Sequence, residues 1–416
     1  MLGSWLRNLA ERRLTRSYIQ FMCLLVLAIY LIVFLLSFST SKGSRTIFGP
    51  HLGADFGAFY VAGKIFNEHS SDQIYQTELQ DRLYREQFPD ADADSRLPYV
   101  NAPFFVLPFT LLSRLPYSWA YLVSVVISLA LYLGGLALMR GSLDEFHPEA
   151  WWIALLLAVS FMPFLVECLA GGQTSAVGFF CLAAAMCSER RGRLFLSGLA
   201  LSVLTYKITL LLLILPMLLI SRRYKTLLGF LIGGAALAIV SWLAVGWQGC
   251  VGFINTLLYF TSASTSAASG LRTWKYVDIN SFFRLLLGAH AYLRWLLTGA
   301  AFLISAPFLF KVWRQRDQGL VWAVTITATV VLNLYVGIYD STLVVLSALL
   351  ISAFLFRTEN TLPWSFKLIL MLLYVVPWVT QPLARVTGVQ LFTIVLAVFF
   401  AYALALSRVA SAGAKQ

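Results

Sequence analysis

The sequence predicts an all-α protein that crosses a membrane many times, and its composition, its apolar runs and its loop charges all favour this fold class. Of 416 residues, 59% are hydrophobic and 12% are charged, which is too little charge to cover a soluble domain of this length. Apolar runs recur from Tyr18 to Ser407, and about 20 apolar residues cross a hydrocarbon core of roughly 30 Å. We therefore expect one integral membrane domain over residues 1–416.

The positive charges predict the topology. Met1–Ser17 holds four arginines and one acid, so the N-terminus should be cytoplasmic. The net charge of +12 lies mostly in short loops, which indicates topology signals and anionic membrane lipids as partners, not nucleic acid. About twelve crossings with both ends inside place nearly all basic clusters on one side. The expected spans are 18–38, 117–139, 151–168, 174–188, 194–206, 207–220, 225–247, 291–313, 319–338, 341–356, 364–380 and 388–407.

Two apolar segments need separate interpretation. Ala102–Leu115 is short and carries prolines, so we expect a helix that lies in the outer interface. Leu194–Ile220 is either one span with Lys207 at its centre or a hairpin with Lys207 at its outer tip. A central lysine costs roughly 2.5–3.5 kcal/mol on insertion scales, and a single span would separate two basic clusters that belong inside. We favour the hairpin, although its helices are short.

Residues 39–116 form the expected outer-face loop with juxtamembrane helices. One helix should begin at Asp55 (DFGAFYVAGKIF) and a second should cover Asp72–Phe88. The acids of PDADADS resemble the start of a calcium loop, but Ser95 and Asn101 replace the expected Gly and Glu. A solvated turn is favoured, and we expect no metal and no cofactor.

Polar residues gather at the outer tips of the predicted hairpins, as a membrane enzyme working at one interface requires. An aspartate directly before a helix most often caps it, and local sequence favours that role for Asp55. A carboxylate there also suits proton abstraction, and the two roles are compatible. Lys207 lies in a long apolar stretch with no acid nearby in sequence, so it needs an anionic partner such as a phosphate.

Two further outer motifs have ordinary explanations as well as functional ones. Gly171-Gly172-Gln173-Thr174-Ser175 interrupts an apolar stretch, and taken alone it is a turn whose Thr174 or Ser175 caps the next helix. Arg272 and Lys275 flank Trp274. They either anchor the chain in the interface or bind phosphate, and the sequence does not separate these roles.

In order along the chain, ADFGAFYVAGK, LPYVNAPFFVLPFTLLSRLP, GGQTS, LTYKITLLLLILP and the pair Tyr339-Asp340 resemble glycosyltransferase family 87, within the C-type membrane glycosyltransferases. The resemblance runs from about Gly53 to Asp340. It implies inverting transfer of a hexose, typically mannose, from a polyprenyl-phosphate sugar to a hydroxyl of a lipid or glycan acceptor. It also implies an active site on the periplasmic or exterior face of a bacterial inner membrane.

The resemblance also suggests roles for individual residues. Asp55 would be the general base, and the donor phosphate would be bound by Lys207, with Arg272 and Lys275 as further candidates. The sugar and acceptor hydroxyls would be bound by Tyr60, Lys64, Asn101, Gln173, Asn280, Tyr339 and Asp340.

Two departures from the family pattern affect the second polar cluster. Asn101-Ala102-Pro103 stands where relatives commonly carry consecutive prolines, and Tyr339-Asp340 stands without the histidine that relatives often have in late outer loops. The acceptor therefore stays open. The alternatives are a transporter or flippase of a lipid-linked sugar, for which ionisable residues should line a path at mid-membrane, and a membrane scaffold without catalytic activity.

Overall fold

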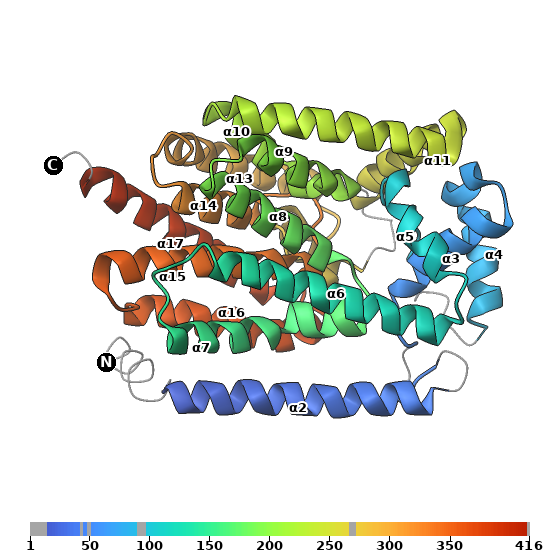
Figure 1. The fold of residues 1–416 in the computed structure, drawn as a ribbon, viewed down its shortest axis with the longest axis horizontal. Coiled ribbons are helices and arrows are strands. Elements are labelled where there is room, and N and C mark those ends of the chain that lie inside the picture. The colour runs from blue at the N-terminus through green and yellow to red at the C-terminus, as the bar shows by residue number, and fades with distance from the viewer. Residues whose placement is uncertain (1–14, 42–44, 48–50, 90–96, 266–271, 414–416) are drawn as a thin grey trace.

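The chain folds into an elongated bundle of helices (Figure 1). The computed structural model describes residues 15–41, 45–47, 51–89, 97–265 and 272–413. Within these residues every regular element is a helix, and two isolated bridges, Arg45 with His51 and Tyr276 with Gly337, are the only β pairing. The all-α prediction is thus confirmed for the part of the chain described.

The helices from the N-terminus to the middle of the chain are α2 (Arg16–Thr40), α3 (Phe56–Glu68), η2 (Ser71–Tyr75), α4 (Thr77–Gln87), η4 (Pro103–Val106), α5 (Leu107–Leu112), α6 (Tyr117–Arg140), α7 (Pro148–Val159), η5 (Pro163–Ala170), α8 (Ser175–Arg190), α9 (Leu194–Ser202) and η6 (Val203–Leu211). The remaining helices are α10 (Ile214–Ile220), α11 (Tyr224–Thr265), η7 (Thr273–Lys275), α12 (Ile279–Leu287), α13 (Ala291–Val312), α14 (Gln318–Val331), η8 (Ile338–Leu343), α15 (Val344–Glu359), α16 (Trp364–Thr387) and α17 (Leu391–Gly413).

Several of these helices can cross a membrane. By length and composition, 8 described helical segments qualify, or 9 if α7 and η5, which meet at a 47° bend, form one span. The protein is therefore a multi-pass membrane protein. The expected count of about twelve stays a prediction, because α8, α10 and α14 have 16, 7 and 14 residues and are short for a full crossing.

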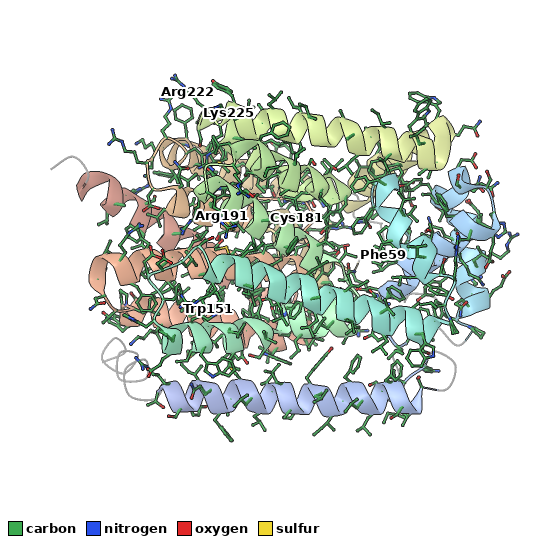
Figure 2. The ribbon with its side chains drawn as sticks, in the orientation of Figure 1. Phe59, Trp151, Cys181, Arg191, Arg222 and Lys225 are labelled. Carbon is green, nitrogen blue, oxygen red and sulfur yellow. The ribbon has the colours of Figure 1, made fainter. Side chains whose placement is uncertain are left out.

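One end of the bundle carries the basic turns, and ion pairs join them there. Arg223 pairs with Glu189 at 2.7 Å, Arg357 pairs with Glu145 at 3.6 Å, and Arg16 pairs with the exposed Glu149. We call this the basic end. Both termini of the described chain lie there, as do Arg191, Arg222 and Lys225 (Figures 1 and 2).

The opposite end is formed by the predicted loop 39–116, whose helices α3, η2, α4, η4 and α5 stack through aromatic rings. Phe59 stacks on Phe109 with ring centroids 4.8 Å apart. The prediction of a single helix over Asp72–Phe88 is wrong, because the backbone is extended at Gln76, between η2 and α4. Tyr75 is buried there and donates a hydrogen bond to the Asn101 carbonyl at 2.6 Å, which turns the chain.

Leu194–Ile220 folds back on itself. Its first helix, α9, runs parallel to α11. Gly198 of α9 packs against Thr226 and Phe230 of α11, and one turn further along both helices Ser202 packs against Gly233. Both helices thus start at the basic end. The segment between α9 and α11 must therefore return to the basic end. Ser221, at the end of that segment, donates a hydrogen bond to the Trp313 carbonyl at 2.6 Å. The turn falls at Lys207, whose φ of −140° and ψ of 88° interrupt the helix. The chain thus reverses at Lys207, as the predicted hairpin requires, and the apolar segment Leu194–Leu211 counted among the candidate spans is interrupted there.

Helix α11 reaches beyond its expected limits. The expected span 225–247 ends where α11 breaks at Gly246, with φ of 66°. The helix then resumes to Thr265 and packs against η2, where Phe253 contacts Tyr75 with ring centroids 5.7 Å apart. The half of α11 beyond Gly246 therefore supports the helices at the end of the bundle opposite the basic end.

Candidate active site

A cavity of about 110 Å³ lies between the α3–α5 region and the turns of the bundle. Its walls come from segments far apart in sequence: the start of α3, the loop before η4, the turn before α8, the break in η6, the outer half of α11, and the loops before α12 and η8. The lining residues are Asp55, Ala58, Phe59, Leu97, Pro98, Tyr99, Val100, Asn101, Gln173, Thr174, Tyr206, Lys207, Ile208, Thr209, Phe253, Leu257, Tyr276, Tyr335 and Tyr339.

Asp55 lies at the start of α3 but its side chain does not cap the helix. Its φ of −83° and ψ of −22° are helical, and its carboxylate makes no cap hydrogen bond. The carboxylate instead accepts a hydrogen bond from the Gln173 amide at 2.8 Å. It is 7% exposed and faces the cavity. The capping role that local sequence favoured is therefore wrong for the side chain.

The GGQTS turn holds the start of α3 through its backbone. The Gly171 carbonyl accepts hydrogen bonds from the N–H groups of Asp55 and Phe56, at 2.9 and 3.2 Å. Gly172 has φ of +79°, and a Cβ there would lie 2.5 Å from the Cβ of Phe56. Glycine is thus required at this turn for conformation and for close approach. The turn fixes Gln173 beside Asp55.

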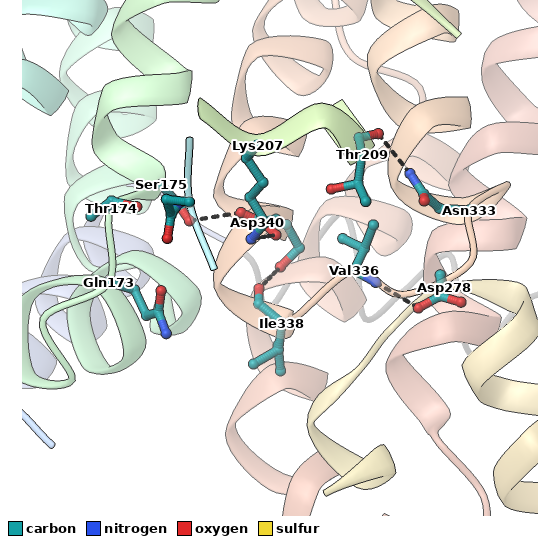
Figure 3. Close-up of polar contacts among 12 residues, drawn as sticks. Gln173, Thr174, Ser175, Lys207, Thr209, Asp278, Asn333, Val336, Ile338 and Asp340 are labelled. Atoms are coloured by element: carbon teal, nitrogen blue, oxygen red, sulfur yellow. Dashed lines mark hydrogen bonds and ion pairs between the residues drawn. The ribbon is translucent and has the colours of Figure 1, made fainter. Parts of the chain in front are cut away.

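Lys207 and Asp340 form an ion pair across the cavity wall (Figure 3). Asp340 is 1% exposed, and its second oxygen accepts a hydrogen bond from the Ser175 hydroxyl at 3.0 Å. The Lys207 ammonium also lies 4.3 Å from the centroid of the Tyr339 ring. The Ser175 hydroxyl therefore binds Asp340. The prediction that Thr174 or Ser175 caps α8 with its side chain is wrong, because the start of α8 has no side-chain cap hydrogen bond.

The ion pair brings together charges that are 133 residues apart. An ammonium has three donors. One is used on Asp340 and one side of the group faces an aromatic ring, so a donor is left that can point into the cavity. Lys207 can thus bridge Asp340 and an anionic oxygen of a ligand.

Aromatic side chains make up much of the remaining wall. Burial raises the pKa of Tyr276 and of Tyr99, so both phenols stay neutral at physiological pH. The Tyr99 hydroxyl donates to the Ala102 carbonyl at 3.1 Å. Flat rings and neutral hydroxyls are suited to the apolar faces and polar edges of a sugar.

Asp278 organises the loops that carry Tyr276 and Tyr339. Its carboxylate accepts hydrogen bonds from the Ser281 N–H at 2.9 Å and the Val336 N–H at 2.7 Å. This contact joins the start of α12 to the loop before η8 (Figure 3). Burial raises the pKa of Asp278 to about 6, although the N–H groups that bind the carboxylate act in the opposite direction.

Six residues of the predicted site are absent from the wall of this cavity: Tyr60, Lys64, Asn280, Arg272, Lys275 and Asp340. Tyr60 donates to the Leu115 carbonyl at 2.9 Å, Lys64 lies 3.9 Å from Glu68, and the Asn280 amide donates to the Leu334 carbonyl at 2.7 Å. Lys275 is the last residue of η7, and Arg272 directly precedes this helix. In contrast, Asp55, Asn101, Gln173, Lys207 and Tyr339 line one cavity, and Asp340 joins it through Lys207.

Sequence reasoning missed the tyrosines Tyr206, Tyr276 and Tyr335 and the acid Glu167. The tyrosines lie in or beside apolar stretches, where an aromatic ring usually indicates core or lipid contact. Glu167, in the π-helical segment η5, accepts a hydrogen bond from Gln381 at 2.5 Å and interacts electrostatically with Lys275 and then Asp55. A carboxylate in an apolar run is the signal that would have identified it.

The helical bundle thus brings an aspartate, a lysine and several aromatic rings together around one cavity. The family model of glycosyltransferase family 87 matches residues 99–336, which is more than half of the chain. The chain belongs to glycosyltransferase family 87, and it is a membrane glycosyltransferase that uses a sugar donor and an acceptor. No curated protein and no solved structure matches it.

Proposed function

We propose that this protein is an inverting hexosyltransferase with the C-type architecture and about twelve crossings. It moves a hexose, most simply mannose, from a polyprenyl-phosphate sugar to a hydroxyl of a lipid or glycan acceptor. The reaction takes place at the outer face of a bacterial inner membrane. One observation carries the proposal: Asp55, which does not cap its own helix, lines the same cavity as Lys207.

Asp55 acts as the general base. The acceptor oxygen attacks the anomeric carbon as the bond from that carbon to the phosphate oxygen breaks, and the acceptor proton passes to the Asp55 carboxylate. A positioned carboxylate within hydrogen-bond reach suits this transfer. Gln173 donates to one oxygen of Asp55 and so fixes the direction in which the other can accept the proton.

The leaving group is a lipid phosphate, which needs positive charge and hydrogen-bond donors instead of an acid. Lys207 supplies both, and Asp340 with Ser175 fixes its position. Asn101, Gln173, Tyr339 and the cavity tyrosines surround the sugar. Lys275 and Arg272 are further basic groups of the same outer loop as the wall residue Tyr276, although they are not part of the cavity lining.

The proposal is tested with the donor in a membrane preparation. Asp55→Asn should lower transfer by about 10²–10⁴-fold, the range that general-base catalysis contributes, while binding of the polyprenyl-phosphate sugar persists. Asp72→Asn is the matched control, because Asp72 is an acid of the same outer-face loop at η2, outside the cavity wall. Transfer by Asp55→Asn at near the wild-type rate would overturn the proposed mechanism.

A transporter or flippase would move the lipid-linked sugar without making a glycosidic bond. Family membership already favours transfer over transport. The two charged residues that line the cavity are also held by local partners, Lys207 by Asp340 and Asp55 by Gln173. Mass spectrometry of the reaction products separates the two functions, since transfer alone adds a hexose to an acceptor.

A further inference from the structure

A second cavity, distinct from the active-site cavity, lies beside α2. It is a groove of about 1900 Å³ between α2, α7 and α16. Helix α2 runs along one edge of the bundle next to α7 (Figure 1), and Cys23 is its one buried residue. Protein interiors do not keep empty spaces of this size, and a groove between membrane helices is open to lipid.

The two ends of the groove differ in polarity. At the basic end it is lined by Arg16, Glu149, Asn360 and Lys367 among other residues of the turns. Toward the opposite end the walls are made by Val33, Val166, Trp378 and Val379 and similar apolar side chains. A molecule that matches both ends of the groove would place a polar head group at the basic end and apolar chains along the rest of the groove.

The polar end carries two cations, Lys367 and Arg16, against one acid, Glu149 in the first turn of α7. Helices α2, α7 and α16 all begin there, and the starts of α7 and α16 have no side-chain cap hydrogen bond. The partial positive charge at a helix start favours an anion. Lys367, in the first turn of α16, is half-buried, and it makes no ion pair with any residue that the structure describes. Arg16 adds a second cation, shared with Glu149.

We propose that this groove binds an anionic phospholipid of the bilayer, with its phosphate at Lys367 and Arg16 and its acyl chains against α2, α7 and α16. The donor lipid fits less well. Its phosphate has to reach Lys207, which lies at the turn of the α9–η6 hairpin away from the basic end, whereas the polar end of the groove is at the basic end. The phospholipid thus joins the first span to the rest of the bundle.

The first experiment measures retained lipid. Protein purified in a mild detergent is analysed by native mass spectrometry and by extraction of its lipids. Wild type should keep about one phospholipid per chain, and Lys367→Glu should reduce this at least tenfold. Lys225→Glu is the matched control, because Lys225 is an exposed lysine in the first turn of α11 at the same end but outside the groove, and it should keep the lipid.

The second experiment measures stability after lipid removal. Transfer into bilayer discs containing phosphatidylglycerol should raise the midpoint of thermal unfolding above that in phosphatidylcholine discs, because a ligand that binds only the folded state stabilises it. Lys367→Glu should lose the difference and Lys225→Glu should keep it. Ala154→Trp, which fills the groove from α7, should displace the lipid without changing charge.

Three results would overturn the proposal: a polyprenyl lipid as the retained molecule, no retained lipid in the wild type, or equal loss in Lys225→Glu and Lys367→Glu. The readouts are lipid content and unfolding, not sugar transfer. Failure here is therefore separate from failure of the proposed glycosyl transfer.

Discussion

At the scale of residues, Asp55 and Lys207 line one cavity, and each is held by a different neighbouring side chain. Gln173 binds the carboxylate at 2.8 Å, and Asp340 binds the ammonium. Lys207 and Asp55 therefore have separate partners and do not neutralise each other. In the proposed mechanism this separation leaves the Asp55 carboxylate able to accept the acceptor's proton.

Because Lys207 and Asp340 are mutual partners, each single truncation should leave an uncompensated charge. Removing one partner of a buried pair costs about 3–5 kcal/mol, and we expect somewhat less here because Lys207 is 19% exposed. Lys207→Met and Asp340→Asn should each lower the midpoint of unfolding, and the double variant should recover part of the loss. Differential scanning fluorimetry in detergent measures this. Additive losses in the double variant would show that the pair does not act as a unit.

Asp278 predicts a pH dependence of stability. Its folded pKa of about 6 lies above the unfolded value of 3.8, so the folded state binds the proton more tightly. The stability from this group is full below about pH 4 and is lost as the pH rises through 6. Asp278→Asn removes this dependence, so the stability of the wild type minus that of the variant should fall between pH 4 and 6. A difference that rises over this range, in unfolding measured at several pH values, would contradict the assignment.

Residue identities and the family resemblance together predicted part of the site. Lys207 stood out because an ionisable group among apolar residues is costly and therefore informative, whereas the roles of Asp55 and Asp340 came from the resemblance. Tyr60 was assigned to the sugar, but its hydroxyl binds a backbone carbonyl, and nothing in the local pattern separates these two uses. The tyrosines of the cavity wall were missed for the same reason, since a tyrosine in an apolar run fits core, lipid and site equally.

At the scale of elements, the hairpin of α9, η6 and α10 decides where Lys207 lies. Its prediction depended on the two basic clusters, which would have been separated by a single span, and the structure has that hairpin. The break within Asp72–Phe88 was not predicted, because its cause is a contact of Tyr75 with Asn101 and Phe253, residues that sequence places far from η2.

The hairpin depends on close packing of α9 on α11. A Cβ at Gly198 would lie 2.0 Å from the Thr226 carbonyl oxygen, so Gly198→Leu should push the helices apart and displace Lys207. Overpacking of this kind costs about 1–3 kcal/mol or more, and donor binding should weaken along with stability. Gly234→Leu is the matched control, because a Cβ at Gly234 in α11 meets no atom within 4 Å. Equal thermal stability and donor affinity in the two variants would contradict this packing role.

At the scale of the whole molecule, charge and shape agree on orientation. The basic turns are joined at one end, and the α3–α5 helices cover the other. From the positive-inside rule we expect the basic end to lie in the cytoplasm. The number of full crossings could not be settled from sequence, because short helices such as α10 are shielded by neighbours and their length alone does not report how deep they lie.

Orientation can be measured with single cysteines in a variant whose 5 native cysteines are replaced. Cysteine introduced at exposed Glu68, at the end of α3, should react in intact cells with a maleimide that does not cross membranes. Cysteine introduced at exposed Lys225, at the basic end, should react only after the membrane is opened. The reverse labelling pattern would invert the proposed topology.

The break in α11 at Gly246 divides that helix into an anchored half and a half that ends over the cavity. Phe253 and Leu257 belong to the second half and form part of the cavity wall. Gly246 has φ of 66°, a backbone conformation that other residues rarely adopt. The bend at this glycine therefore sets the direction of the second half of α11, and with it where Phe253 and Leu257 meet the cavity.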